Sequence, residues 1–165
     1  VGKRKESPAE HTWSSLVLAD YFLNLMKDDS IDRLKVYEML MYHDLIEIEV
    51  GDTCLSKIEE RQDKEEKEKE ALPVFKNKLP EAIRGKFEVL FTEFIEQKTH
   101  EAKFCKAVEY LDAEIHELDY KEDWKGWTEE FLREKKERLF EEFPEMREVF
   151  EKSTKFARDN GFFEQ

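Results

Sequence analysis

Apolar residues recur at the three- and four-residue spacing of an α-helix along most of this chain. Little interrupts the pattern, since only 5 glycines and 4 prolines occur among 165 residues. Residues suited to begin a helix precede the apolar stretches, namely Pro8, Ser30, Pro80, Thr99 and Thr128. The alternating segment at residues 46–50 is short and directly continues a helical stretch. The sequence therefore predicts an all-α fold, a bundle of about six or seven helices, with the last helices over residues 128–160.

The first two apolar stretches predict the buried faces of two helices. Residues expected on the first face are Leu16, Ala19, Tyr21, Phe22, Leu25 and Met26. Residues expected on the second, after Ser30 as its N-cap, are Ile31, Leu34, Tyr37, Met39, Leu40 and Met41.

The charge balance excludes two classes of partner. With 41 acidic and 28 basic side chains the net charge is −13, whereas proteins that bind nucleic acid polymers need clustered positive charge. No apolar run approaches the ~18 residues of a membrane span. We therefore expect no nucleic acid polymer and no membrane as partner, although a local basic pocket for one small phosphate is compatible with this charge.

Chain length and cysteine content suggest an ordinary intracellular setting. A length of 165 residues fits one domain over residues 1–165. Cys54 and Cys105 are too few for a disulfide framework, and the first ten residues lack the apolar core of a signal peptide. The expected location is the reducing cytoplasm.

The first candidate for chemistry is the doublet His43-Asp44, which follows an apolar helical stretch. Glu47 and Asp52 come soon after it, and Gly51 permits a tight turn before Asp52. An imidazole and three carboxylates facing a common space would suit Mn²⁺, Fe²⁺, Co²⁺ or Zn²⁺ better than Ca²⁺. The alternative is a helix C-terminus stabilised by a cationic His43, with the acids in solvent.

His11 strengthens the metal interpretation. It lies just after the helix start at Pro8, and Arg4 is close upstream. An arginine beside a metal site is suited to hold a phosphate. The alternative is that His11 is a surface histidine in the first turn of its helix.

Three stretches together resemble the HD-domain phosphohydrolases, and more narrowly their 5′-deoxynucleotidase-like branch. They are SPAEHTW at residues 7–13, HDLIEIEVGD at residues 43–52 and EAKFCK at residues 101–106. The resemblance covers residues 4 to about 120. Three ordered motifs are much more specific than a His-Asp pair alone.

The resemblance implies one divalent transition metal (Mn, Co, Fe or Zn) held by a first-helix histidine, the His-Asp doublet and a later aspartate. These positions correspond to His11, His43, Asp44 and residue 109. Residue 109 is glutamate, whose extra methylene displaces the carboxylate. Asp112, three residues later, is the alternative ligand. A two-iron oxidative centre is disfavoured, because only His100 lies between the doublet and Glu109.

The resemblance also implies the roles of four further residues. The catalytic acids correspond to Glu47 and Asp52, one to handle the attacking water and one to protonate the leaving alcohol. Arg4 and Lys106 would contact the substrate phosphate.

The function implied is a metal-dependent phosphohydrolase that releases phosphate from nucleoside 5′-monophosphates, with deoxyribonucleotides preferred. Two alternatives stay open, a hydrolase of another phosphate ester and a non-catalytic module that binds metal or nucleotide. The branch commonly dimerises, so a homodimer is also expected. The aromatic residues that could form its surface, Phe87, Phe91, Phe94 and Trp124, fit ordinary core packing better.

Overall fold

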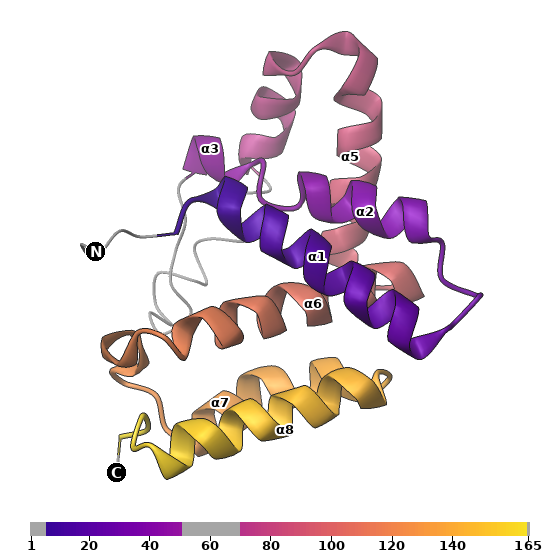
Figure 1. Ribbon diagram of the computed structural model, residues 1–165. Coiled ribbons are helices and arrows are strands. Elements are labelled where there is room, and N and C mark those ends of the chain that lie inside the picture. The colour runs from indigo at the N-terminus through magenta and orange to yellow at the C-terminus, as the bar shows by residue number, and fades with distance from the viewer. Residues whose placement is uncertain (1–5, 51–69, 165) are drawn as a thin grey trace.

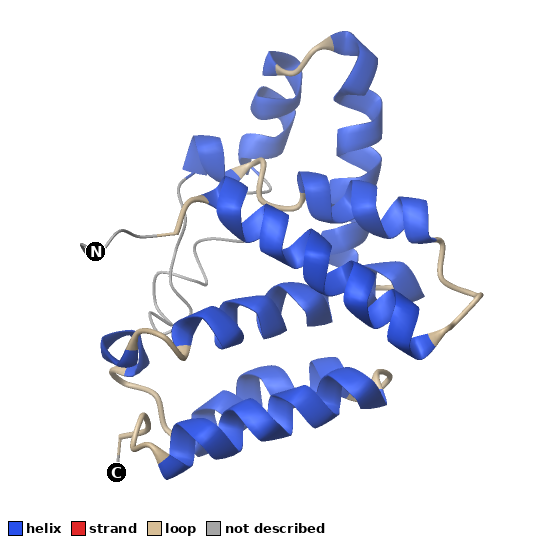
Figure 2. Cartoon of the chain, in the orientation of Figure 1, coloured by secondary structure: helices blue, strands red, loops and turns tan. Residues whose placement is uncertain are grey.

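The computed structural model describes residues 6–50 and 70–164, and in these ranges the regular structure is entirely helical (Figures 1 and 2). The all-α prediction is confirmed. Of the predicted site residues, Arg4 and Asp52 lie outside the described ranges.

Helix α1, Pro8–Met26, begins where the sequence predicts. Ser7 and Glu10 form a capping box, in which Glu10 N donates to Ser7 Oγ at 3.3 Å and Ser7 N donates to Glu10 Oε2 at 3.0 Å. The helix ends at Lys27, whose φ of 53° is left-handed. This cap fixes the position of His11 in the first turns of α1.

Helix α2, Arg33–Tyr42, is capped by Asp32 and not by Ser30. Lys35 N donates to Asp32 Oδ1 at 3.1 Å, whereas Ser30 donates from both its N and Oγ to Asp28 Oδ1. The Ser30 cap predicted from the sequence is therefore wrong, because Ser30 closes the preceding turn. A run of turns at residues 43–46 leads to the short helix α3, Glu47–Val50.

The remaining described chain is also helical. Residues 70–78 form a helix, and α5 spans Glu81–Glu96 after Pro80, which is its N-cap. Helix α6, His100–Glu117, and helix α7, Glu129–Lys136, are capped by Thr99 and Thr128 as predicted. Two 3₁₀ turns, η1 (Lys121–Trp124) and η2 (Glu137–Phe140), flank α7, and α8 spans Pro144–Asp159.

Helix α6 lies at the centre of this arrangement. It packs against α1, α2 and α5 on one side and against α8 and η2 on the other. In Figure 1, α7 and α8 lie side by side below α6, and α1 and α2 lie above it. A continuous cluster of buried side chains joins these layers, including Phe22, Leu40, Phe91, Phe104, Val108 and Phe150. Phe87, Phe91, Phe94 and Trp124 are all buried, so they belong to the core and form no surface on this chain.

Only some of the residues predicted for the apolar faces of α1 and α2 are buried. Ala19, Phe22, Met39 and Leu40 are buried as expected. Tyr21 and Leu25 on α1 are 54 % and 47 % exposed, and Leu34 and Met41 on α2 are 66 % and 47 % exposed. No helix in the described ranges is long and apolar enough to cross a membrane.

A fully buried ion pair connects α6 to the C-terminal helices. Lys136 Nζ lies 3.5 Å from Glu114 Oε2, and both side chains are 0 % exposed. Ser153 Oγ of α8 donates to Glu114, and Lys136 Nζ donates to the Tyr110 carbonyl at 3.4 Å. Burial raises the pKa of Glu114 against the opposing effects of Lys136 and Ser153. The pair therefore depends on both partners, since either charge alone would be buried without compensation.

We predict that Lys136→Met destabilises the protein by about 3 kcal/mol, because it leaves Glu114 buried without its cation. Lys135→Met is the matched control, since Lys135 is its partly exposed neighbour and should change stability by less than about 0.5 kcal/mol. Urea unfolding followed by circular dichroism measures both variants. Equal stability of the two variants would contradict this account of the pair.

Candidate metal centre

His43 lies at the C-cap of α2, and its side chain is fully buried. Its Nδ1 is 2.6 Å from the Leu40 carbonyl oxygen, and its ring meets Phe94 edge-on at 5.5 Å between centroids. Burial lowers the pKa of His43 to about 4, despite the nearby charge of Glu109. The ring is therefore neutral at pH 7. Because a carbonyl only accepts, Nδ1 carries the proton and Nε2 has the lone pair.

This state is the opposite of the cationic helix cap that was one alternative for His43. A neutral, buried imidazole contributes no positive charge to the end of α2. The His43 Nε2 atom is instead a buried acceptor with no hydrogen-bond partner among residues 6–50 and 70–164. Such an atom is rare in folded proteins and calls for a hydrogen-bond donor or a cation.

Asp44 places a carboxylate close to that nitrogen. Its Oδ2 lies 3.2 Å from His43 Nε2 and 3.7 Å from His11 Nε2. Hydrogen bonds from Leu45 N to the Tyr42 carbonyl and from Glu47 N to the Asp44 carbonyl fold the chain tightly here. These turns hold Asp44 beside the end of α2.

His11 reaches the same point from the first turns of α1. The centroids of its ring and the His43 ring are 5.4 Å apart. Burial alone lowers the pKa of His11, but the hydrogen bond to Asp112 and the charges of Asp44, Asp112 and Glu109 outweigh it and raise the pKa to about 9. In the metal-free protein His11 is thus an imidazolium surrounded by carboxylates. These carboxylates would favour a bound cation for the same electrostatic reason.

The three side chains fit a divalent cation. One ligand atom from each of His11, His43 and Asp44 lies within 4.8 Å of the others. His43 Nε2 and a carboxylate oxygen of Asp44 lie 3.2 Å apart, and the repulsion between these two acceptors is relieved by a cation that both can bind. Two imidazole nitrogens and one carboxylate oxygen suit Mn²⁺, Fe²⁺, Co²⁺ or Zn²⁺.

Glu109 and Lys106 pair with each other at the edge of this group. Glu109 Oε2 is 2.8 Å from Lys106 Nζ, one turn earlier on α6. Burial favours the neutral form of Glu109, but Lys106 together with the nearby His43 and His11 outweighs it and lowers the pKa of that carboxyl. Lys106 Nζ also lies over the rings of Phe94 at 4.7 Å and Tyr110 at 5.1 Å. Glu109 is close enough to influence both histidines, yet it is not one of the three clustered ligands.

Asp112 lies on the opposite side of the His11 ring. Its Oδ2 is 2.9 Å from His11 Nδ1, whereas the cluster with Asp44 forms around His11 Nε2. The serines beside His11 also reach it, since Ser14 Oγ donates to Asp112 Oδ2 at 2.7 Å and Ser15 Oγ at 3.4 Å. Sequence analysis missed these serines. The spacing of Ser14 three residues after His11 is the sequence feature that places both on one helix face.

Glu47 is the first residue of α3, three residues after Asp44, and its side chain is partly buried. Its backbone position is set by the turn that contains Asp44, through the 3.0 Å hydrogen bond from Glu47 N to the Asp44 carbonyl. The turn after the doublet therefore determines where the backbone of Glu47 lies.

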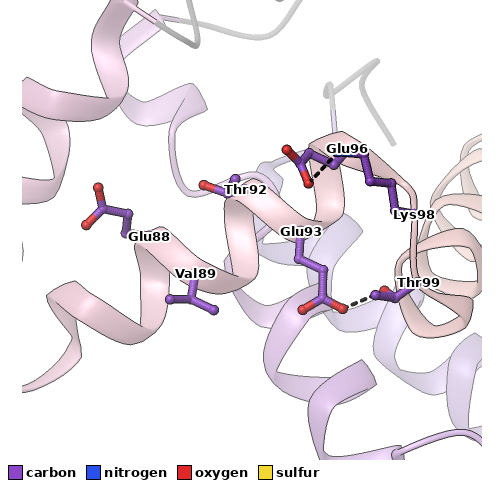
Figure 3. A pocket seen from close by; sticks show the side chains of 7 residues that line it. All are labelled: Glu88, Val89, Thr92, Glu93, Glu96, Lys98 and Thr99. Atoms are coloured by element: carbon purple, nitrogen blue, oxygen red, sulfur yellow. Dashed lines mark hydrogen bonds and ion pairs between the residues drawn. The ribbon is translucent and has the colours of Figure 1, made fainter.

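A separate hollow of about 350 Å³ opens on the outer side of α5 (Figure 3). It is lined by Glu88, Val89, Thr92, Glu93, Glu96, Lys98 and Thr99. Its carboxylates are paired within the protein: Glu88 with Lys76, Glu93 with Lys35, and Glu96 with Lys98 at 3.2 Å. Lys98 is the one cation among these lining residues and is itself paired with Glu96, so the hollow is unsuited to a phosphate substrate.

Comparison with known families places this geometry in context. Residues 1–147 match the family model of the HD domain. The chain belongs to the HD domain family. The resemblance found in the sequence is thereby confirmed, and the clustered His11, His43 and Asp44 contain the His-Asp doublet that carried it.

Two HD-domain relatives are named 5′-deoxynucleotidase HDDC2. The Homo sapiens protein is 27 % identical over 120 residues, which are 73 % of this chain and 57 % of that protein. The Danio rerio protein is 27 % identical over 132 residues, or 79 % of this chain and 64 % of that protein. The chain thus spans less than two thirds of these curated relatives.

One solved structure has a similar fold, and its match extends over nearly the full length of this chain. It is described as a predicted metal-dependent phosphohydrolase from Magnetospirillum magnetotacticum MS-1. It is 25 % identical, has a TM-score of 0.81, and the match covers 99 % of this chain and 85 % of that one.

The raised pKa of His11 predicts how the stability of the metal-free HD domain depends on pH. An unfolded histidine has a pKa near 6.5, whereas folded His11 has a pKa of about 9. The stabilisation from its imidazolium is therefore fully present below about pH 6.5 and is lost as the pH rises through about 9. Urea unfolding of EDTA-treated protein at several pH values between these limits measures the decline.

His11→Gln should flatten this dependence on pH, and His100→Gln should preserve it as the matched histidine control. An unchanged slope in His11→Gln would show that another group causes the decline.

Proposed function

We propose that this HD-domain chain is a metal-dependent phosphohydrolase acting on nucleoside 5′-monophosphates, with deoxyribonucleotides preferred. The observation that carries the proposal is the buried His43 Nε2, which lies 3.2 Å from Asp44 and beside His11 and has no hydrogen-bond partner in the described part of the chain. The substrate class is supported by the relatives named 5′-deoxynucleotidase and by the predicted metal-dependent phosphohydrolase of similar structure.

His11, His43 and Asp44 would hold one divalent transition metal, with Glu109 as the candidate fourth ligand. When bound, this ion would polarise a phosphoryl oxygen and lower the pKa of a coordinated water. The neutral state of His43 and its Nδ1–H bond to Leu40 prepare its Nε2 for this role without loss of a proton. Its fixed ring also limits the reorganisation needed when the ion binds.

Hydrolysis requires proton transfer at both ends of the bond that breaks. Water oxygen attacks phosphorus, the bond from phosphorus to the 5′-oxygen breaks, and the products are inorganic phosphate and a nucleoside. Of Glu47 and Asp52, one takes the proton of the attacking water and the other protonates the 5′-oxygen. Arg4 and Lys106 would contact the phosphate and offset its charge.

We predict that phosphate release from 5′-monophosphates requires Mn²⁺ or Co²⁺ and falls about 10²–10⁴-fold in Glu47→Gln. The assay measures inorganic phosphate from a panel of deoxy and ribo 5′-monophosphates after treatment with EDTA and addition of each metal. Glu49→Gln is the matched control, because Glu49 lies on the same short helix and pairs with Lys78. Full activity in excess EDTA would contradict the proposal, and turnover of other phosphate esters alone would change the substrate class.

A second candidate function is a non-catalytic HD module that binds a metal or a nucleotide. The observation that favours it is the ion pair between Glu109 and Lys106, which holds the glutamate at 2.8 Å from a lysine and not in the ligand cluster. This candidate predicts a shift in melting temperature with nucleotide and no turnover on the same panel.

Substitution at residue 109 separates the two candidates. We predict that Glu109→Asp increases metal affinity on the order of tenfold, because the shorter side chain gives up Lys106 and presents its carboxylate to the cluster. Glu109→Gln, which removes the charge at nearly constant size, should give no gain. Isothermal titration with Mn²⁺ measures both variants. Equal affinities of the Asp variant and the wild type would mean that glutamate serves this position as well as aspartate.

A further inference from the structure

Asp112 is the acceptor of an unusually large set of donors. Its side chain, only 7 % exposed, lies on the face of α6 that packs against α1. Three side chains of α1 converge on its Oδ2 atom: His11 Nδ1 at 2.9 Å, Ser14 Oγ at 2.7 Å and Ser15 Oγ at 3.4 Å. A carboxylate that accepts several such bonds is held in one orientation.

A second ring of contacts closes around Asp112. His116, one turn later on α6, has its Nδ1 at 3.6 Å from Asp112 Oδ2 and at 3.2 Å from Glu6 Oε1. Glu6 in turn lies 4.0 Å from His11 Nδ1. These contacts join Glu6, just before the α1 cap, to the last turn of α6. Two of the acids involved, Asp112 and Glu6, also contact His11 Nδ1.

This arrangement determines which nitrogen of His11 is available. A carboxylate beside Nδ1 holds a proton there, because only a protonated Nδ1 can donate to it. The two nitrogens of an imidazole point away from each other, so Nε2 is left to face Asp44 at 3.7 Å. Asp112 therefore cannot use the same Oδ2 to join the cluster formed by His11 Nε2, His43 and Asp44.

We propose that Asp112 is a positioning residue that fixes the tautomer and ring orientation of His11, with Ser14 holding Asp112 in place. The inference rests on the proposed function, because it concerns His11 as a metal ligand. The sequence analysis considered Asp112 as a metal ligand in place of Glu109. The inference instead assigns it the role of orienting a ligand. Partners of this kind around ligating histidines change metal affinity by about 10–100-fold.

The test compares metal binding by Asp112→Asn, Ser14→Ala and His11→Gln with the wild type. Co²⁺ affinity is measured by competition with a chelator, and the visible spectrum of bound Co²⁺ reports its ligands. Asp112→Asn should weaken binding about 10–100-fold and keep the wild-type Co²⁺ spectrum, since no ligand is lost. His11→Gln should alter the spectrum. Asp119→Asn, an exposed residue just beyond α6, is the matched control and should change neither.

Nuclear magnetic resonance of the Zn²⁺-loaded protein gives a readout independent of affinity. The Nδ1–H proton of His11 should be protected from exchange with water in the wild type, and it should exchange faster in Asp112→Asn and in Ser14→Ala. The Ser14 variant keeps both histidines and the carboxylate, so it tests the inference even if Asp112→Asn fails to fold.

The outcomes distinguish this inference from the proposed function. A wild type that binds neither Co²⁺ nor Zn²⁺ would overturn the proposed function. A wild type that binds metal, with unchanged affinity and Nδ1–H exchange in both variants, would overturn the positioning role alone. A Co²⁺ spectrum altered in Asp112→Asn as it is in His11→Gln would show that Asp112 is itself a ligand.

Discussion

The contact between α1 and α6 is the constraint on which the candidate metal centre depends. It places residue 112 against the first turns of α1, where Asp112 meets His11 at 2.9 Å and Ser14 at 2.7 Å across about a hundred residues of sequence. The packing of α1 against α2 brings His11 to the end of α2, where His43 and Asp44 leave the helix. The buried apolar residues of all three helices hold this geometry, since Phe22, Leu40 and Phe104 belong to one core cluster.

The two histidines beside Asp44 have different charge states in the metal-free protein. His43 is neutral because burial against Phe94 removes it from water, and a backbone carbonyl determines its tautomer. His11 is surrounded by Asp44, Asp112 and Glu109, which favour its charged form in the metal-free protein. Both rings direct Nε2 toward Asp44 and have an acceptor at Nδ1. A cation at this point would take over the positive charge that His11 supplies in the metal-free protein.

The sequence predicted the helices well where local chemistry decides them. Thr99 and Thr128 cap α6 and α7, and Pro8 begins α1, because the capping side chain and its target lie within one turn. It failed where the answer depends on neighbours in space, as at Ser30, which bonds back to Asp28, and at Leu34, which is 66 % exposed. The doublet His43-Asp44 was recognisable because both residues are adjacent in sequence. The choice between Glu109 and Asp112 was not decidable in this way, because it depends on how α6 is rotated against α1.

That rotation gives the two acids of α6 different environments. They are three residues apart, so they lie on neighbouring parts of one helix face, yet one meets a lysine and the other a histidine. Lys106 can reach Glu109 because it precedes it by one turn, and the rings of Phe94 and Tyr110 keep the Lys106 ammonium at that level. Asp112 faces α1, and its short side chain accepts from Ser14 and lies beside Nδ1 of His11. The longer acid therefore lies beside an ammonium and the shorter one beside an imidazole. In this chain Asp112 is engaged across the helix interface by His11, and Glu109 is engaged within its own helix by Lys106.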